Sequence, residues 1–190
     1  MFRPLFLISA FLLLTFSAAR ADTDTFKQPD LVSFGVGYRD FDKSAAKRQS
    51  ADFRGEYRWG LSMLPLISPW FKSWDNAVQF HPFAGLEVGS LGQGYLTGGW
   101  AMDWYMTKHL IFTWSEGAGL YEGGNAVRLG SFLEFRSQAE FGWRFDNEVR
   151  FTAEISHISN AKITKFNPGS EIAGFYLHVP IDVICGKKPQ

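Results

Sequence analysis

The chain has 190 residues, a length that fits one domain, with 19 basic and 19 acidic side chains and a formal net charge of zero. This balance argues against nucleic acid as a partner, because binding to it calls for a clear basic excess. Cys185 is the only cysteine, which excludes an internal disulfide and any metal site built on cysteine pairs.

The first 21 residues have the features of a secretory signal peptide. Arg3 supplies the positive start, residues 5–16 form the apolar stretch, and Ala19-Arg20-Ala21 is a cleavage site of the A-x-A type. The apolar stretch is shorter than the roughly 20 residues of a spanning helix, which disfavours an uncleaved anchor. Cleavage after Ala21 would leave a domain of residues 22–190 with 17 basic and 19 acidic side chains, a net charge of −2.

The remaining chain has no run of 18 apolar residues and is rich in Phe, Trp and Gly. Helices and closed β-barrels are the only structures that satisfy every backbone polar group in lipid. If this chain spans a membrane, it must therefore do so as a barrel.

The first two predicted strands show the expected alternation of side chains. In residues 31–41, apolar side chains at even positions alternate with Ser, Gly and Arg. In residues 52–59, Phe, Tyr and Trp alternate with Asp52, Arg54, Glu56 and Arg58. A soluble sandwich could not bury that charged face, whereas a small membrane barrel can turn it inward, where Arg and Glu pair with one another.

Further segments of period two follow, and they bring the count to eight strands. They are residues 84–88, 96–106, 110–119, 132–143, 149–156 and 175–183. Eight strands make the smallest bacterial outer-membrane barrel, with an interior that side chains can fill. The predicted fold class is therefore all-β, an eight-stranded antiparallel transmembrane β-barrel, with an interior ion-pair network of Arg54, Glu56, Arg58, Glu134, Arg136 and Glu140.

Strand order also predicts which connections face outward. With both chain ends in the periplasm, the outer connections are 42–51, 89–94, 121–126 and 160–170, and the short turns at 107–108 and 146–147 are inner. The connection 60–77 is long and apolar for an inner turn, so we expect it along the membrane interface. The chain ends Gly186-Lys187-Lys188-Pro189-Gln190, without the aromatic residue that ends many such barrels, which puts its insertion signal in question.

Three polar residues occupy positions on the predicted lipid-facing side. His157 and Ser159 continue the odd-numbered series that contains Phe151 and Ile155, and Glu171 has the same parity in the last strand. A serine becomes a strong nucleophile when a base takes its proton and a third group orients that base. The pattern predicts these three roles for Ser159, His157 and Glu171; the alternative is that they are ordinary solvated residues at the barrel rim.

The stretch His157-Ile158-Ser159-Asn160-Ala161, with Asn167-Pro168-Gly169 and Glu171 after it, resembles the H-x-S-N motif and downstream Glu of the lipid A 3-O-deacylases, the PagL family. The Glu follows the His by 14 residues, as that pattern requires. The resemblance implies a Ser159-His157-Glu171 triad on the lipid-facing wall, with Asn160 contributing to the oxyanion hole. It also implies hydrolysis of the acyl chain ester-linked at position 3 of lipid A, in the outer leaflet of the bacterial outer membrane, without metal or cofactor.

Other interpretations stay open at this point. Lys43, Lys47 and Arg48 could contact the phosphates of lipid A, although a solvated charged loop is the simpler interpretation. A non-catalytic structural barrel or adhesin would leave lipid A unchanged, and a palmitoyl transferase would add acyl mass. A soluble lipid-carrying barrel is disfavoured by the charged interior faces. The sequence leaves open the preferred acyl length and a homodimer.

Overall fold

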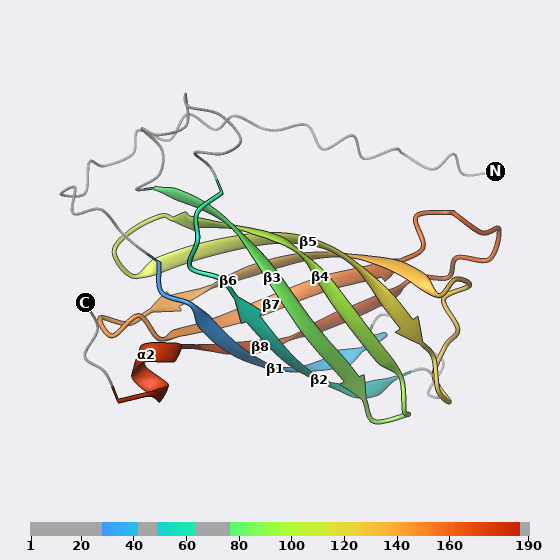
Figure 1. Cartoon of the computed structure of the whole chain (residues 1–190). Helices are drawn as coiled ribbons and strands as arrows, with labels where there is room; N and C mark the ends of the chain where they lie inside the picture. The colour runs from blue at the N-terminus through green and yellow to red at the C-terminus, as the bar shows by residue number, and fades with distance from the viewer. Residues whose placement is uncertain (1–27, 42–48, 64–76, 187–190) are drawn as a thin grey trace.

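The computed structural model describes residues 28–41, 49–63 and 77–186 and forms a closed antiparallel barrel (Figure 1). The strands are β1 Leu31–Arg39, β2 Ser50–Arg58, β3 Val78–Gly89, β4 Gly94–Tyr105, β5 Leu110–Glu122, β6 Leu133–Arg144, β7 Arg150–Ser159 and β8 Ser170–Pro180. Because β1 pairs with both β2 and β8, no strand edge is left open. The predicted fold class is confirmed. The expected signal peptide and most of the connection 60–77 lie outside the described residues.

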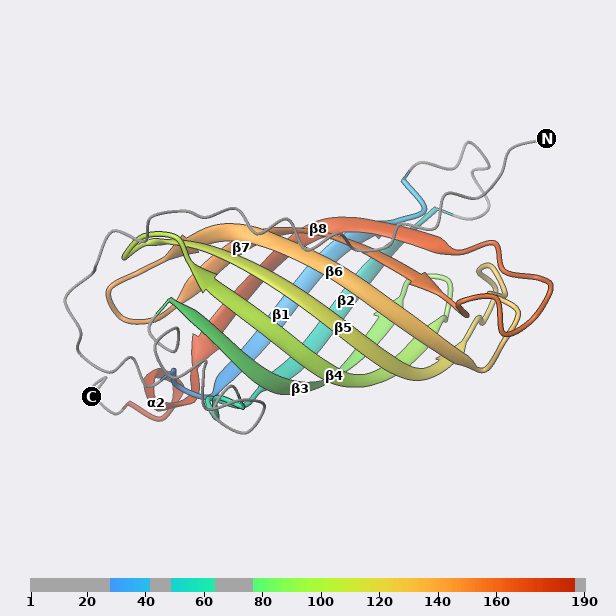
Figure 2. The same ribbon diagram turned by 90° about the horizontal axis from the view of Figure 1, so that it is seen from above.

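The strands cross the barrel obliquely, and their connections gather at its two ends (Figures 1 and 2). One end, here called the loop end, holds residues 90–93, 123–132 and 160–169. The other, the turn end, holds residues 106–109 and 145–149 and the short helix α2, Ile181–Ile184. Within the described ranges, no helix has the length and apolar character needed to cross a bilayer.

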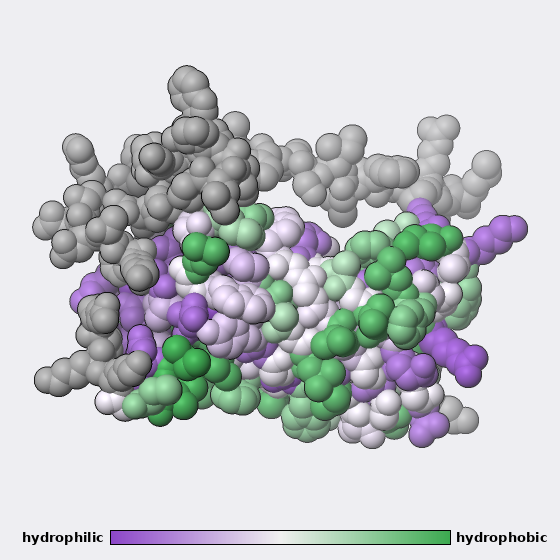
Figure 3. Space-filling view, viewed as in Figure 1, coloured by the Kyte–Doolittle hydropathy of each residue, from purple (hydrophilic) through white to green (hydrophobic). Residues whose placement is uncertain are grey.

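Side chains alternate between an apolar wall and a polar interior. The exposed large side chains on the wall include Phe34, Phe53, Leu96, Phe141 and Phe151. Figure 3 shows apolar side chains (green) running over one face of the barrel, with hydrophilic ones (purple) mostly toward its ends. An apolar exterior around a charged interior reverses the usual pattern of a soluble protein and is typical of a membrane barrel.

The interior is held by buried ion pairs. Arg54 Nε lies 2.8 Å from Asp52 Oδ1 and 3.1 Å from Glu87 Oε2. Arg58 Nη2 lies 3.0 Å from Glu56 Oε2, and Arg136 pairs with the other oxygen of the same carboxylate. The predicted network is confirmed for Arg54, Glu56, Arg58, Arg136 and Glu140. Glu134 is buried but accepts a hydrogen bond from the backbone N–H of Ser131 instead.

Two strand predictions were wrong in extent. β3 begins at Val78, six residues before the predicted start, because the long β4 pairs with it as far as Val78 opposite Trp104. The sequence pattern did not predict this extension because Pro82 lies within it, and proline usually interrupts strands. β8 ends at Pro180, opposite Leu31 at the start of β1, and one further bond from Ile181 N–H to Asp30 O follows it. The residues after Pro180, predicted as strand, form α2.

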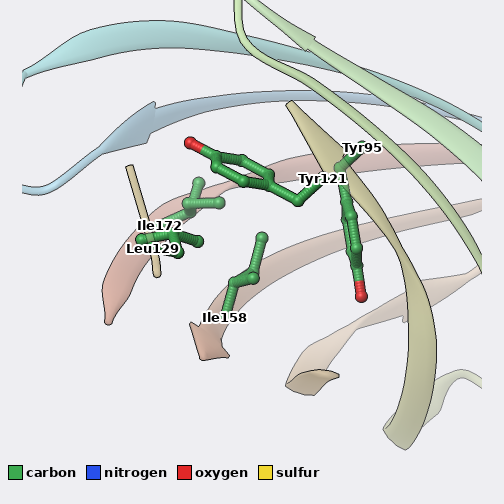
Figure 4. Close-up of a cluster of buried hydrophobic side chains, with 5 residues drawn as sticks. All are labelled: Tyr95, Tyr121, Leu129, Ile158 and Ile172. Atoms are coloured by element: carbon green, nitrogen blue, oxygen red, sulfur yellow. The ribbon is translucent and has the colours of Figure 1, made fainter. Parts of the chain in front are cut away.

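Five apolar side chains pack together inside the loop end of the barrel. Figure 4 shows Tyr95, Tyr121, Leu129, Ile158 and Ile172 pointing toward one another from β4, β5, the 123–132 connection, β7 and β8. All five are buried. This cluster fixes β7 and β8 against the rest of the barrel at the level where His157, Ser159 and Glu171 face outward.

Candidate active site

The end of β7 places His157 and Ser159 on the outer wall. Residues of β7 alternate between exposed and buried from Phe151 onward, and His157 is exposed while Ser159 is partly exposed. The residue between them, Ile158, is fully buried in the apolar cluster. The inward anchor at Ile158 thus fixes both neighbours in the outward orientation that the alternation predicts.

The pairing of β7 with β8 brings Glu171 to the imidazole. His157 and Glu171 are directly opposite each other in the strand register. His157 Nδ1 lies 3.1 Å from Glu171 Oε1, and the side chains are 50% and 25% exposed, so the pair is reachable from outside the barrel. With Nδ1 engaged by the carboxylate, Nε2 is the ring nitrogen left to act as a base.

Ser159 lies on the same face of β7, two residues from His157, which corresponds to roughly 7 Å along a strand. The hydrogen bonds formed by the described residues include none between Ser159 and the imidazole. Catalytic hydrogen bonds are often long in the free enzyme and tighten when the substrate binds. The structure therefore brings His157 and Glu171 into contact and places Ser159 beside them.

The backbone of Gly169 lies close to the imidazole of His157. Its φ is +64°, and a Cβ placed on it would lie 2.8 Å from His157 Cε1 and 3.5 Å from Nε2. Only glycine adopts this backbone conformation at no steric cost and allows so close an approach. The backbone of Gly169 therefore forms one wall of the space around the imidazole of His157.

Asn160 connects the 123–132 and 160–169 loops. Its Nδ2 donates to Leu129 O at 2.9 Å, to Thr164 Oγ1 at 2.9 Å and to Phe166 O at 3.0 Å, and the residue is fully buried. Its backbone N–H donates to Asn167 Oδ1. The predicted oxyanion role for the Asn160 side chain does not match these contacts, because both amide N–H groups are already directed at loop acceptors.

Other basic and histidine side chains lie away from this site or outside the described residues. Lys43, Lys47 and Arg48 fall outside the described residues, so their contact with phosphates stays a prediction. His81 and His178 are buried in the interior beside Asp103 and Glu140, at 3.2 and 3.0 Å. In the described part of the chain, no three His, Cys, Asp or Glu side chains gather as a metal site.

An outward-facing imidazole and carboxylate beside a serine, on the wall of an eight-stranded membrane-type barrel, is the kind of arrangement that serine hydrolases use. The comparisons with known proteins agree with this class. A family model described as "Lipid A 3-O-deacylase (PagL)" matches residues 32–180. The chain belongs to this family and is an outer-membrane β-barrel esterase that acts on lipid A. Family membership favours deacylation over the non-catalytic and acyl-transferring alternatives.

The solved structures that are similar to the chain include the following two. The first, titled "Crystal structure of the outer membrane enzyme PagL", is 19% identical with a TM-score of 0.60 and covers 79% of this chain and 99% of its own. The second, from a study of designed transmembrane β-barrels, is 13% identical with a TM-score of 0.51, over 83% and 100% of the two chains. At these identities the likeness shows the fold alone. No curated protein sequence matched the chain.

Proposed function

We propose that this lipid A 3-O-deacylase acts through Ser159 as nucleophile, His157 as general base and Glu171 as the group that orients the imidazole. The observation that carries the assignment is the 3.1 Å contact between His157 Nδ1 and Glu171 Oε1 on the outer wall. It leaves Nε2 available to Ser159, which shares the same face of β7. The substrate is then met from within the membrane. We place the site level with the outer leaflet because, among the connections described in full, the two longest, 123–132 and 160–169, are at the loop end.

The reaction proceeds in two steps. His157 Nε2 takes the proton of Ser159 Oγ, which attacks the ester carbonyl carbon, and the imidazolium then returns the proton to the departing sugar hydroxyl. Water, deprotonated by the same imidazole, attacks the acyl-enzyme and releases the fatty acid and the free serine. The ionised Glu171 stabilises the imidazolium in both steps.

The negative charge on the carbonyl oxygen needs hydrogen-bond donors. Since the Asn160 amide is engaged by Leu129 and Phe166, we assign this role to backbone N–H groups of the 160–169 loop. Gly169 is the strongest candidate, because its backbone lies against the imidazole. Asn160 then acts as a positioning residue that shapes this loop. A homodimer and a contact of Lys43, Lys47 and Arg48 with phosphate stay predictions.

Ser159→Ala tests the proposal. The variant should fold, and lipid A treated with it should keep its mass in mass spectrometry, whereas the wild-type protein should release the 3-linked acyl chain. Ser156→Ala is the matched control, because Ser156 lies on the same strand with its hydroxyl in the interior, 3.1 Å from Arg54 Nη2. The control should remain active. Full activity of folded Ser159→Ala would end the proposal.

A further inference from the structure

A second polar pair lies on the outer wall, outside the triad. Glu116 on β5 and Ser137 on β6 both face outward and are partly buried. Ser137 Oγ donates to Glu116 Oε2 at 2.7 Å, and Trp114 Nε1 donates to Glu116 Oε1 at 3.0 Å. A carboxylate on the lipid-facing side of a membrane strand is unfavourable, and such residues usually have a function.

The pair is in register with the proposed active site. Glu116 is opposite Ser137, Ser137 is opposite His157, and His157 is opposite Glu171, so the four residues form one row across β5 to β8. Residues directly opposite in an antiparallel sheet have Cβ atoms about 5 Å apart, which puts Ser137 next to His157 and Glu116 at roughly 10 Å.

This row holds most of the polar groups on the wall. Setting Tyr and Trp aside, the outward-facing side chains with polar atoms in the eight described strands are Glu116, Glu122, Ser137, His157, Ser159 and Glu171. Glu122 is at the loop end of β5, whereas Glu116 lies near the middle of that strand. The row therefore leads from the loop end at Glu171 toward the middle of the barrel wall.

The hydrogen bonds of the pair define what it can bind. The Trp114 N–H and the Ser137 O–H are both used on the carboxylate, so the groups left to a ligand are acceptors: the remaining lone pairs of Glu116 and those of Ser137 Oγ. The ligand must therefore bring an O–H or N–H donor. Phosphate is disfavoured, because a carboxylate repels it. The outward neighbours Ala118, Phe135 and Ala139 are apolar, which suits a donor carried by an acyl chain.

We infer that Glu116 and Ser137 form a subsite that accepts a hydrogen bond from a hydroxyl or amide N–H in the acyl region of the lipid A substrate. The inference rests on the proposed function, since the row places this subsite beside His157. The subsite holds the acyl region in line with Ser159, and it makes the enzyme selective for acyl regions that carry a donor.

Glu116→Leu tests the inference with three synthetic lipid A analogues that share the same scissile ester. The first carries a hydroxyl on the ester-linked chain and an amide-linked neighbouring chain. The second lacks the hydroxyl, and the third also has its amide nitrogen methylated. Glu116→Leu removes a hydrogen bond to a charged group. Its kcat/KM should therefore be about ten- to a hundredfold below that of the wild-type protein, but only for the analogues that carry the recognised donor. If the loss is absent with the second analogue, the donor is the hydroxyl. If the loss persists with the second analogue and is absent with the third, the donor is the amide N–H.

Three further variants make the result decisive. Ser137→Ala should lower the same selectivity, and Glu116→Gln, which keeps an acceptor oxygen, should give a smaller loss than Glu116→Leu. Phe141 is an exposed wall position on β6 outside the row. Phe141→Leu should leave the ratios of kcat/KM between the three analogues unchanged. An equal loss for all three analogues would show a merely structural role and overturn the inference. Activity of Ser159→Ala would instead overturn the proposed function, so the two failures are distinguishable.

Discussion

Substitution of Gly169 by Ala tests the geometry of the proposed active site, because it adds a single atom, the Cβ, next to His157. The added Cβ would lie 2.8 Å from His157 Cε1, whereas ordinary contact begins at 3.4 Å, so the imidazole would have to retreat by about 0.6 Å. A misplacement of about 1 Å at a reacting group can cost roughly a hundredfold in rate. We therefore expect kcat/KM for deacylation to fall by about ten- to a hundredfold.

The same substitution also strains the backbone. Gly169 has φ +64°, and an L-residue in this conformation costs about 1–2 kcal/mol. The free energy of unfolding, measured by guanidinium denaturation of the protein in lipid vesicles, should fall by that amount. Deacylation is measured in parallel as fatty-acid release from purified lipopolysaccharide.

Gly92 provides the matched control for Gly169. It also lies in a connection at the loop end and has φ +82°, but a Cβ placed on it meets nothing within 4 Å. Gly92→Ala should lose similar stability and keep full activity. Wild-type activity in Gly169→Ala would refute the placement of its backbone against the imidazole. An equal loss of activity in both variants would assign the effect to backbone strain.

The remaining predictions concern the residues that support His157. Glu171→Gln keeps the size of the side chain but removes the charge that stabilises the imidazolium, so kcat should fall by about a thousandfold or more with a small change in KM; an unaltered kcat would remove Glu171 from the mechanism. Ile158→Ala leaves a cavity in the cluster of Figure 4 and should lower the free energy of unfolding by about 2–5 kcal/mol in the same denaturation assay. A change below 1 kcal/mol would contradict the packing described for β7.

The alternation of residue types was enough to predict which side chains face outward. A strand has a period of two, so the parity of Phe151 and Ile155 extends to His157 and Ser159 without knowledge of the partner strands. The pairing of strands is less local. Parity predicted that Glu171 faces outward like His157, and the family motif added the spacing of 14 residues between them. Their direct opposition in the strand register depends on where the 160–169 loop begins and ends.

Other features escaped prediction for identifiable reasons. The start of β3 was missed because Pro82 interrupts the pattern, and α2 was missed because strand ends depend on the length of the neighbour. Glu116 was not predicted as a functional residue, because it is one charged residue among the apolar residues at the outward positions of 110–119. Its parity was nevertheless the available signal, because a carboxylate at an outward position of a membrane strand is unfavourable without a partner or a function.

In the segment from His157 to Asn160, the proposed catalytic residues and the residues that stabilise the loop end share one short stretch of chain. Its side chains alternate, so His157 and Ser159 face the wall while Ile158 enters the apolar cluster and Asn160 joins the 123–132 and 160–169 loops. A shift of β7 by one residue against β8 would exchange these faces, burying the imidazole and exposing Ile158. Because such a shift would also break the cluster and the loop contacts of Asn160, the packing that stabilises the loop end is the same packing that keeps His157 opposite Glu171.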